Sequence, residues 1–93
     1  MKKFVIERNF PGAGNLTKEK LQEISQVSCE VIKQLDKIYY WLHSYVCYDK
    51  IYCVHIPETE EVLREHARLC KFPINTISKI KAIIDPLTSN PLT

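Results

Sequence analysis

The segment from Trp41 to His66 constrains the fold more than any other part of the chain. Tyr39–Cys47 is rich in aromatic and β-branched residues and predicts a strand, Tyr48–Lys50 predicts a turn, and Ile51–Ile56 predicts the returning strand. The Trp41–His66 segment also holds all three histidines, two of the four cysteines and the only tryptophan. Candidate chemistry is therefore concentrated in one hairpin and the helix start that follows it.

Patterns on either side of this hairpin predict two helices and a first strand. Alternating apolar and polar residues at Lys3–Asn9 predict the strand, and Thr17 is suited to cap a helix over Lys18–Asp36. The apolar residues of that helix recur at three- and four-residue spacing, which predicts one buried face: Leu21, Ile24, Val27, Val31 and Leu35. Acidic residues favour a second helix start at Pro57–Glu61, and Phe72–Pro73 ends that helix.

A last strand over Thr76–Ile84 completes the order βαββαβ. Because crossovers are right-handed and neighbouring strands tend to pair, this order predicts a ferredoxin-like α+β sandwich. Two helices then cover one face of a four-stranded antiparallel sheet, and the other face is solvated or buried against a partner. We expect residues 1–86 to form this single domain and residues 87–93 to form a loose C-terminal tail.

Length, charge and hydropathy narrow the class of protein. Ninety-three residues make one domain with a thin core, which a dimer would enlarge. The formal net charge of +2 is too small to indicate nucleic-acid binding. No signal-peptide core follows Met1–Lys3, and no apolar run approaches the roughly 20 residues of a membrane span. We therefore expect a cytoplasmic protein that binds neither nucleic acid nor membrane, with four free thiols because Cys-x-x-Cys is absent.

The register of the hairpin decides which side chains meet. If the loop is Tyr48–Lys50, His43 lies opposite His55 and shares one face of the sheet with Cys53. The face toward the helices then carries Leu42, Val46, Val54 and Ile56. If the loop is only Asp49–Lys50, the pairing slips by one residue and the sheet separates His43 from His55 and Cys53. We favour the first register because its helix-facing side is more uniformly apolar.

In the favoured register, possible metal ligands gather on one face of the sheet. Glu7 in the first strand points to the same side as His43, Cys53 and His55. Imidazole suits zinc, copper, iron and nickel, and a thiolate or carboxylate adds negative charge to such a site. The alternative is that the two histidines are packing residues of an interface, with satisfied hydrogen bonds.

His66 differs from the hairpin histidines because it lies on a helix. Its spacing from Leu63, Ala67 and Cys70 places it on the face directed toward the sheet. A lone histidine there is more often a hydrogen-bonded core residue than a ligand, although it stays a candidate. A catalytic interpretation rests on Cys53 as a nucleophile with a hairpin histidine as base, and no complete catalytic motif accompanies it.

Seven short motifs extend through the chain from about Lys3 to Pro86: Phe4–Gly14, His43–Val46, Asp49–Lys50, Cys53–Val54, Arg64–Ala67, Phe72–Pro73 and Ile84–Pro86. In this order they resemble a family of small bacterial proteins of otherwise unassigned function, one member of which is described as a nickel-binding protein. The resemblance implies a ferredoxin-like protomer, a homodimer whose sheets meet as in dimeric α+β barrels, and nickel as the bound metal.

The resemblance also places Glu7, His43, Cys53 and His66 within family motifs. Similar members often have tyrosine where this chain has His55, which would make His55 an additional ligand peculiar to this protein. The predicted metal ligands are therefore His43, His55, Cys53, Glu7 and His66.

Together these features predict a small homodimer that binds a divalent transition metal, with nickel implied by the resemblance. Its aromatic strand face, with Tyr39, Trp41 and Tyr45, is expected to pack against a second copy. Such a protein would store, buffer or deliver the ion rather than catalyse. The alternatives are a small α+β-barrel enzyme of the monooxygenase or haem-handling type, using the pocket between sheet and helices, and an interaction module without a ligand.

Overall fold

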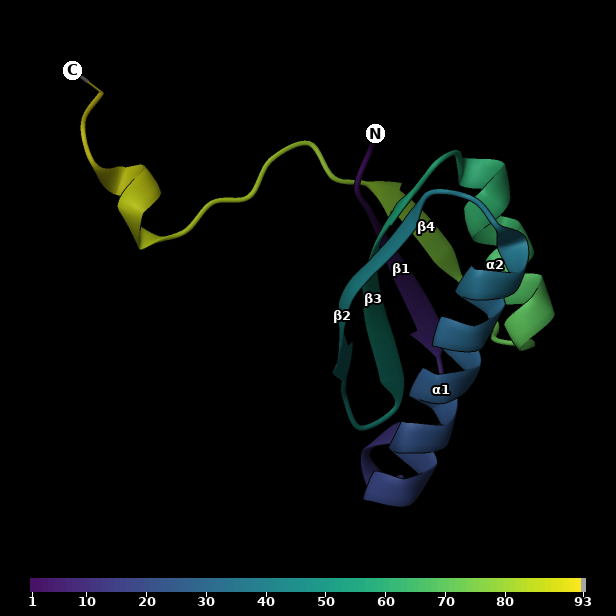
Figure 1. Cartoon of the computed structure of the whole chain (residues 1–93). Helices are drawn as coiled ribbons and strands as arrows, with labels where there is room; N and C mark the ends of the chain where they lie inside the picture. The colour runs from purple at the N-terminus through teal and green to yellow at the C-terminus, as the bar shows by residue number, and fades with distance from the viewer. Residues whose placement is uncertain (93) are drawn as a thin grey trace.

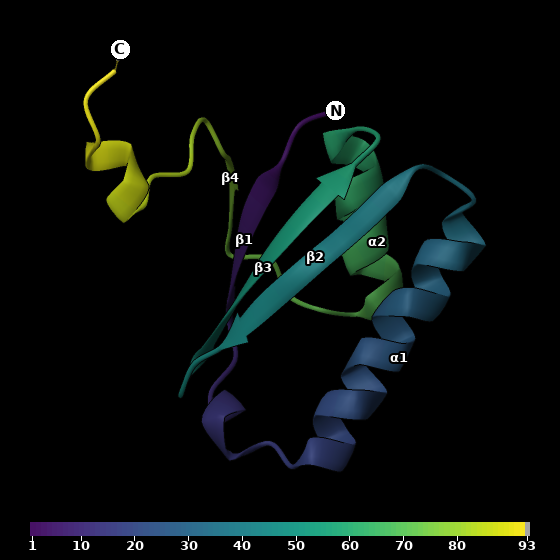
Figure 2. The ribbon, with the colours of Figure 1, turned by 60° about the vertical axis from the view of Figure 1, so that its left-hand side comes forward.

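The computed structural model describes residues 1–92 and shows a mixed α+β fold. Its elements are β1 (Phe4–Asn9), α1 (Lys18–Leu35), β2 (Tyr39–Val46), β3 (Lys50–Pro57), α2 (Glu60–Cys70) and β4 (Thr76–Lys79), with short 3-10 helices η1 (Ala13–Asn15) and η2 (Pro86–Ser89). The strands form one antiparallel sheet in the order β2-β3-β1-β4. Both helices lie against the same face of this sheet (Figures 1 and 2), as the βαββαβ order predicts.

Threonine caps set the starts of both long helices. The Thr17 hydroxyl accepts a hydrogen bond from the Lys20 backbone N–H at 3.1 Å, which confirms the predicted cap of α1. The Thr59 hydroxyl likewise accepts from Val62 N–H at 3.3 Å, so α2 begins at Glu60. This start lies within the predicted segment Pro57–Glu61, of which Pro57 still pairs in the sheet as the last residue of β3.

The pairing of β2 with β3 differs from the favoured register. His43 lies opposite Val54, and Trp41 lies opposite His55. Leu42, between them, is a β-bulge, which shifts the pairing of the two halves of β2 by one residue. The prediction that His43 faces His55 was therefore wrong. As in the alternative register, the sheet lies between His43 and both His55 and Cys53, but the loop is not Asp49–Lys50, because Val46 pairs with Ile51 and Lys50 belongs to β3.

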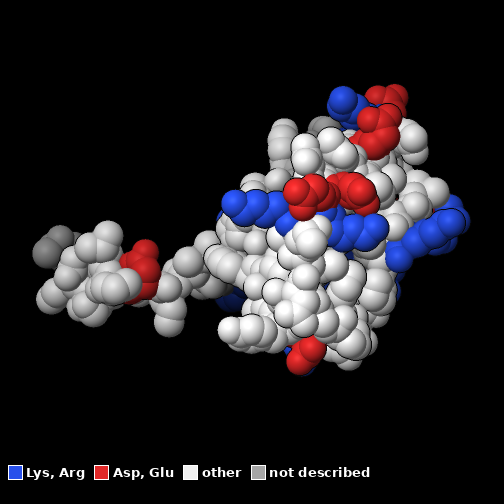
Figure 3. Space-filling view, turned by 90° about the horizontal axis from the view of Figure 1, so that it is seen from below, with Lys and Arg blue, Asp and Glu red and all other residues white. Residues whose placement is uncertain are grey.

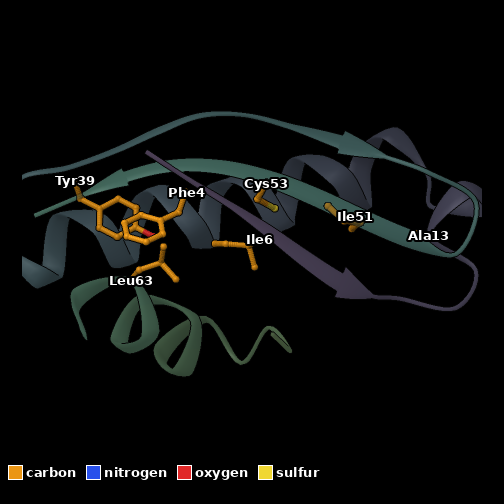
Figure 4. Close-up of a cluster of buried hydrophobic side chains, with 7 residues drawn as sticks. All are labelled: Phe4, Ile6, Ala13, Tyr39, Ile51, Cys53 and Leu63. Carbon is orange, nitrogen blue, oxygen red and sulfur yellow. The ribbon is translucent and has the colours of Figure 1, made fainter. Parts of the chain in front are cut away.

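The bulge also changes which residues the helices cover. On β3 the buried positions are Ile51, Cys53, His55 and Pro57. Val54 and Ile56, expected to face the helices, instead alternate with them and are half-buried on the open face. The hydrophobic core between the sheet and the helices is made by Phe4, Ile6, Ala13, Tyr39, Ile51, Cys53 and Leu63 (Figure 4).

The last strand is shorter than predicted, and the chain leaves the sheet after it. Lys79 pairs with Phe4, the first residue of β1, and one further bond joins Ile80 N–H to the Lys3 carbonyl at 2.8 Å. Residues 81–84 therefore have no strand beside them, which is why β4 ends early. The segment with η2 extends away from the sheet (Figures 1 and 2). Residue 93 of the predicted tail lies outside the described residues.

Membrane-spanning helices are absent from the part of the chain that the structure describes. Neither α1 nor α2 combines the length and the hydropathy needed to cross a bilayer.

Candidate functional site: a buried polar cluster and the open sheet face

The structure divides the five predicted ligands between the two sides of the sheet. Cys53 and His55 are buried on the helix-covered side, where His66 of α2 also points. Glu7 lies on the open side because it alternates with the buried residues of β1, and His43 lies there because the bulge pairs it with Val54 of the open face. The cluster of Glu7, His43, Cys53 and His55 predicted on one face of the sheet therefore does not form.

The two predicted ligands on the open side are not neighbours. Strand β3 lies between β1, which carries Glu7, and β2, which carries His43. The Glu7 carboxylate pairs with the Lys50 ammonium at 3.6 Å. His43 is exposed, and its ring meets that of Tyr45 edge-on with centroids 5.0 Å apart. The accessible imidazole of this face thus stands beside an aromatic ring and away from the carboxylate.

Large apolar side chains are exposed on the open face around His43. Tyr40, Leu42 and Tyr45 have exposed fractions of 55%, 45% and 59%. The sequence predicts an aromatic face of Tyr39, Trp41 and Tyr45, which is wrong for two of the three: Tyr39 is buried in the core, and Trp41 points to the helix-covered side opposite His55.

On the helix-covered side, buried polar side chains form a connected cluster. The Tyr39 hydroxyl and His55 Nδ1 are 2.6 Å apart. His66 Nε2 lies 3.2 Å from both the carbonyl and the hydroxyl oxygen of Ser28. Because a backbone carbonyl only accepts, His66 Nε2 carries the proton and donates it to Ser28. The Nδ1 atom of His66 is then a bare acceptor, with no hydrogen-bond partner among residues 1–92.

Burial keeps this cluster uncharged at neutral pH. Desolvation, with repulsion from His66 and Arg8, lowers the pKa of His55 to about 3. Desolvation also lowers the pKa of His66, against the hydrogen bond to the Ser28 backbone. Burial raises the pKa of the Tyr39 hydroxyl and raises that of the Cys70 thiol to about 11. Two neutral imidazoles, a phenol and a thiol therefore share this part of the core.

The buried cluster does not fit a complete nickel site within one protomer. Among the described residues, no group of three or more His, Cys, Asp and Glu side chains is placed to hold a metal ion. One ring nitrogen of His55 is taken by Tyr39, and one of His66 is taken by Ser28. Burial also keeps the Cys70 thiol protonated, whereas a metal binds thiolate.

Arg8 is the residue of this region that the sequence did not point to. Its side chain is 4% exposed and lies on the helix-covered side of β1. One guanidinium nitrogen, Nη1, donates to the Pro73 carbonyl at 2.9 Å, and the guanidinium carbon lies 5.6 Å from the centre of the Phe72 ring. Its Nε is buried and has no hydrogen-bond partner in residues 1–92. The alternation of Phe4, Ile6 and Arg8 places Arg8 inward, but a charged residue near a strand end normally suggests solvent.

A pocket opens beside Arg8, between α1 and the sheet. It offers about 80 Å³ to the centre of a water molecule. Its lining includes the buried Arg8 and His66 as well as the exposed Val46 and Pro73, so it runs from the core toward the surface.

The surface that is seen from below relative to Figure 1 carries mixed charge. In the view of Figure 3, acidic and basic side chains are interspersed and stand beside a broad uncharged area. The face shown there has no large patch of a single sign.

Comparison with known proteins links the chain to one family. A family model described as "Nickel responsive protein SCO4226-like" matches residues 4–80. The crystal structure of SCO4226 from Streptomyces coelicolor A3(2) is similar, with a TM-score of 0.72 over 88% of this chain and 99% of that chain. The sequence identity is 15%, so this likeness shows a shared fold. No curated protein matches the chain.

Proposed function

The chain belongs to the nickel responsive SCO4226-like family, and we propose that it binds a divalent transition metal, nickel first, as a homodimer. Family membership is the observation that carries the choice of metal. The dimer would form through the open faces of two sheets, and the protein would store, buffer or deliver the ion in the cytoplasm. We further propose that residues 1–86 act as one folding unit.

His43 is the donor that best suits such a site. It is exposed, whereas His55 and His66 are buried and each has a ring nitrogen engaged in a hydrogen bond. A neutral imidazole is a good ligand for nickel. One imidazole does not make a site, and the described part of a protomer groups no three donors. A second copy related by a two-fold axis would bring a second His43 to the same interface.

The apolar character of the open face supports this assembly. Tyr40, Leu42 and Tyr45 surround His43 and are each about half exposed. Contiguous exposed apolar side chains of this size mark interaction surfaces more often than free surface. Of the other predicted ligands, Glu7 shares the open face, whereas Cys53, His55 and His66 would stabilise the core rather than bind the metal.

Calorimetric titration with nickel, on protein purified without an affinity tag or added metal, tests the proposal. We expect His43→Ala to lose most of the nickel binding while keeping its circular dichroism spectrum. Tyr40→Phe changes the same face without removing a nitrogen donor and should bind as wild type does. Binding should also weaken as the pH falls, because protons compete for the ligating imidazole.

Two results would contradict different parts of the proposal. Nickel binding by His43→Ala as tight as that of wild type would remove His43 from the site. Sedimentation that shows only monomers at micromolar concentration, with and without nickel, would rule out the sheet-to-sheet dimer.

A further inference from the structure

We propose that the pocket between α1 and the sheet binds a small carboxylic acid, whose carboxylate pairs with Arg8 and whose hydrocarbon part lies among apolar side chains. This site is on the helix-covered side of the sheet, opposite the face proposed for the metal. It is therefore independent of nickel binding, and either proposal can fail without the other.

The first reason is the unbalanced charge of Arg8. An arginine side chain does not lose its proton in a protein, so burial leaves the guanidinium charged. The salt bridges among residues 1–92 all involve other side chains. The Pro73 carbonyl satisfies one N–H of Arg8, and its Nε–H has no partner among the described residues. A buried charge without a counter-charge is strongly destabilising, so a bound anion would relieve the cost.

The second reason is the chemistry of the pocket wall. No aspartate or glutamate belongs to the lining, so nothing there competes with an anion for Arg8. Much of the wall is aromatic or aliphatic, with Phe10, Ile24 and Trp41 among its members. Trp41 Nε1 donates to the Ser44 hydroxyl at 2.9 Å, which leaves the Ser44 O–H free to donate to a ligand. A positive charge beside a largely apolar wall suits an organic anion better than an inorganic one.

Size and hydrogen bonding narrow the ligand further. The pocket offers about 80 Å³ to water centres. A single water needs about 10–15 Å³ on this measure, so the pocket has room for roughly five to eight water-sized groups. An acid of about four carbons matches that room. His66 also lines this pocket, and its Nδ1 is an acceptor without a partner among the described residues, so we expect a hydroxyl group on the acid to bind there.

The only tryptophan of the chain provides the readout. Trp41 lines the pocket, so its fluorescence should change as the pocket fills. The full-length protein is titrated with butyrate, with butyramide as an uncharged analogue of the same size, and with inorganic phosphate. Arg8→Met removes the buried charge at similar volume, and Arg64→Met removes an exposed arginine of α2 as the matched control. Ile24→Phe narrows the pocket and leaves its charge unchanged.

We expect saturable binding of butyrate, and binding about ten- to one-hundredfold weaker for Arg8→Met, since a hydrogen-bonded charge pair is lost. Butyramide and phosphate should bind at least tenfold more weakly than butyrate, Ile24→Phe should weaken binding, and Arg64→Met should match wild type. Titration with 2-hydroxybutyrate tests the role of His66 Nδ1, because the added hydroxyl group should make this acid bind more tightly than butyrate. No saturable response to butyrate at millimolar concentration, or equal affinity of butyrate for Arg8→Met and wild type, would overturn the site. Equal affinity for butyrate and 2-hydroxybutyrate would mean that His66 is not part of the site.

Discussion

Lowering the pH from 6.5 to 5 should reduce the free energy of unfolding by about 2 kcal/mol through His55 alone. Burial, followed by repulsion from His66 and Arg8, lowers the pKa of His55 in the folded protein from 6.5 to about 3. Between these two pKa values His55 binds a proton in the unfolded chain but not in the folded protein. The free energy of unfolding therefore decreases as the pH falls. Each pH unit in this window costs about 1.4 kcal/mol, and the interval from 6.5 to 5 spans about one and a half units.

Urea unfolding followed by Trp41 fluorescence at pH 7 and pH 5 measures this difference. The His55→Asn variant keeps a polar acceptor near the Tyr39 hydroxyl but cannot be protonated in this range. Its stability should fall less between the two pH values than that of wild type, by about 2 kcal/mol.

Two outcomes would refute the assignment. Wild-type stability that changes by less than about 0.5 kcal/mol between these pH values would mean that His55 titrates alike in both states. A pH dependence of His55→Asn equal to that of wild type would place the acid-sensitive group elsewhere. His66, whose pKa is also lowered, acts in the same direction and accounts for sensitivity that remains in His55→Asn.

Two further expectations concern the core and the thiols. Tyr39→Phe removes the hydroxyl that lies 2.6 Å from His55 Nδ1 and leaves a buried nitrogen unpaired. The free energy of unfolding in urea should fall by about 1–3 kcal/mol. As a control, Tyr45→Phe changes an exposed residue and should lower it by under about 0.5 kcal/mol. All four cysteines are free thiols, of which Cys29 and Cys47 are exposed, so thiol titration should count two in the native protein and four under denaturant. A native count of four would show that the buried pair is accessible.

The element order of this fold can be predicted from the sequence because it depends on local patterns. Thr17 has a hydroxyl that can accept a hydrogen bond, and it directly precedes an amphipathic segment. Its hydroxyl caps α1 as expected. The hairpin register was missed for a physical reason. A bulge adds one residue to one strand, and the side-chain pattern alone does not show which residue is extra. Leu42 is apolar and so fits either face in the sequence, and pairing across the sheet is needed to identify it.

The candidate site was predictable only in part, because its chemistry comes from contacts distant in sequence. The helical spacing of His66 correctly places it inward. Its partner Ser28, however, lies 38 positions away on another helix, and no local pattern links the two. Arg8 was missed because a buried unpaired arginine is rare enough that its sequence position suggests solvent.

The bulge at Leu42 also bears on how readily this edge of the sheet can pair with another chain. Strand β2 lies at an edge of the sheet and is eight residues long, so its outer side presents backbone N–H and C=O groups that another strand could pair with. A bulge bends and twists such an edge and interrupts the regular spacing that fibre growth requires. Deleting Leu42 would restore a regular edge that carries two exposed tyrosines, Tyr40 and Tyr45. Besides setting the face of His43, the one extra residue would thus make this edge a poorer template for edge-to-edge pairing.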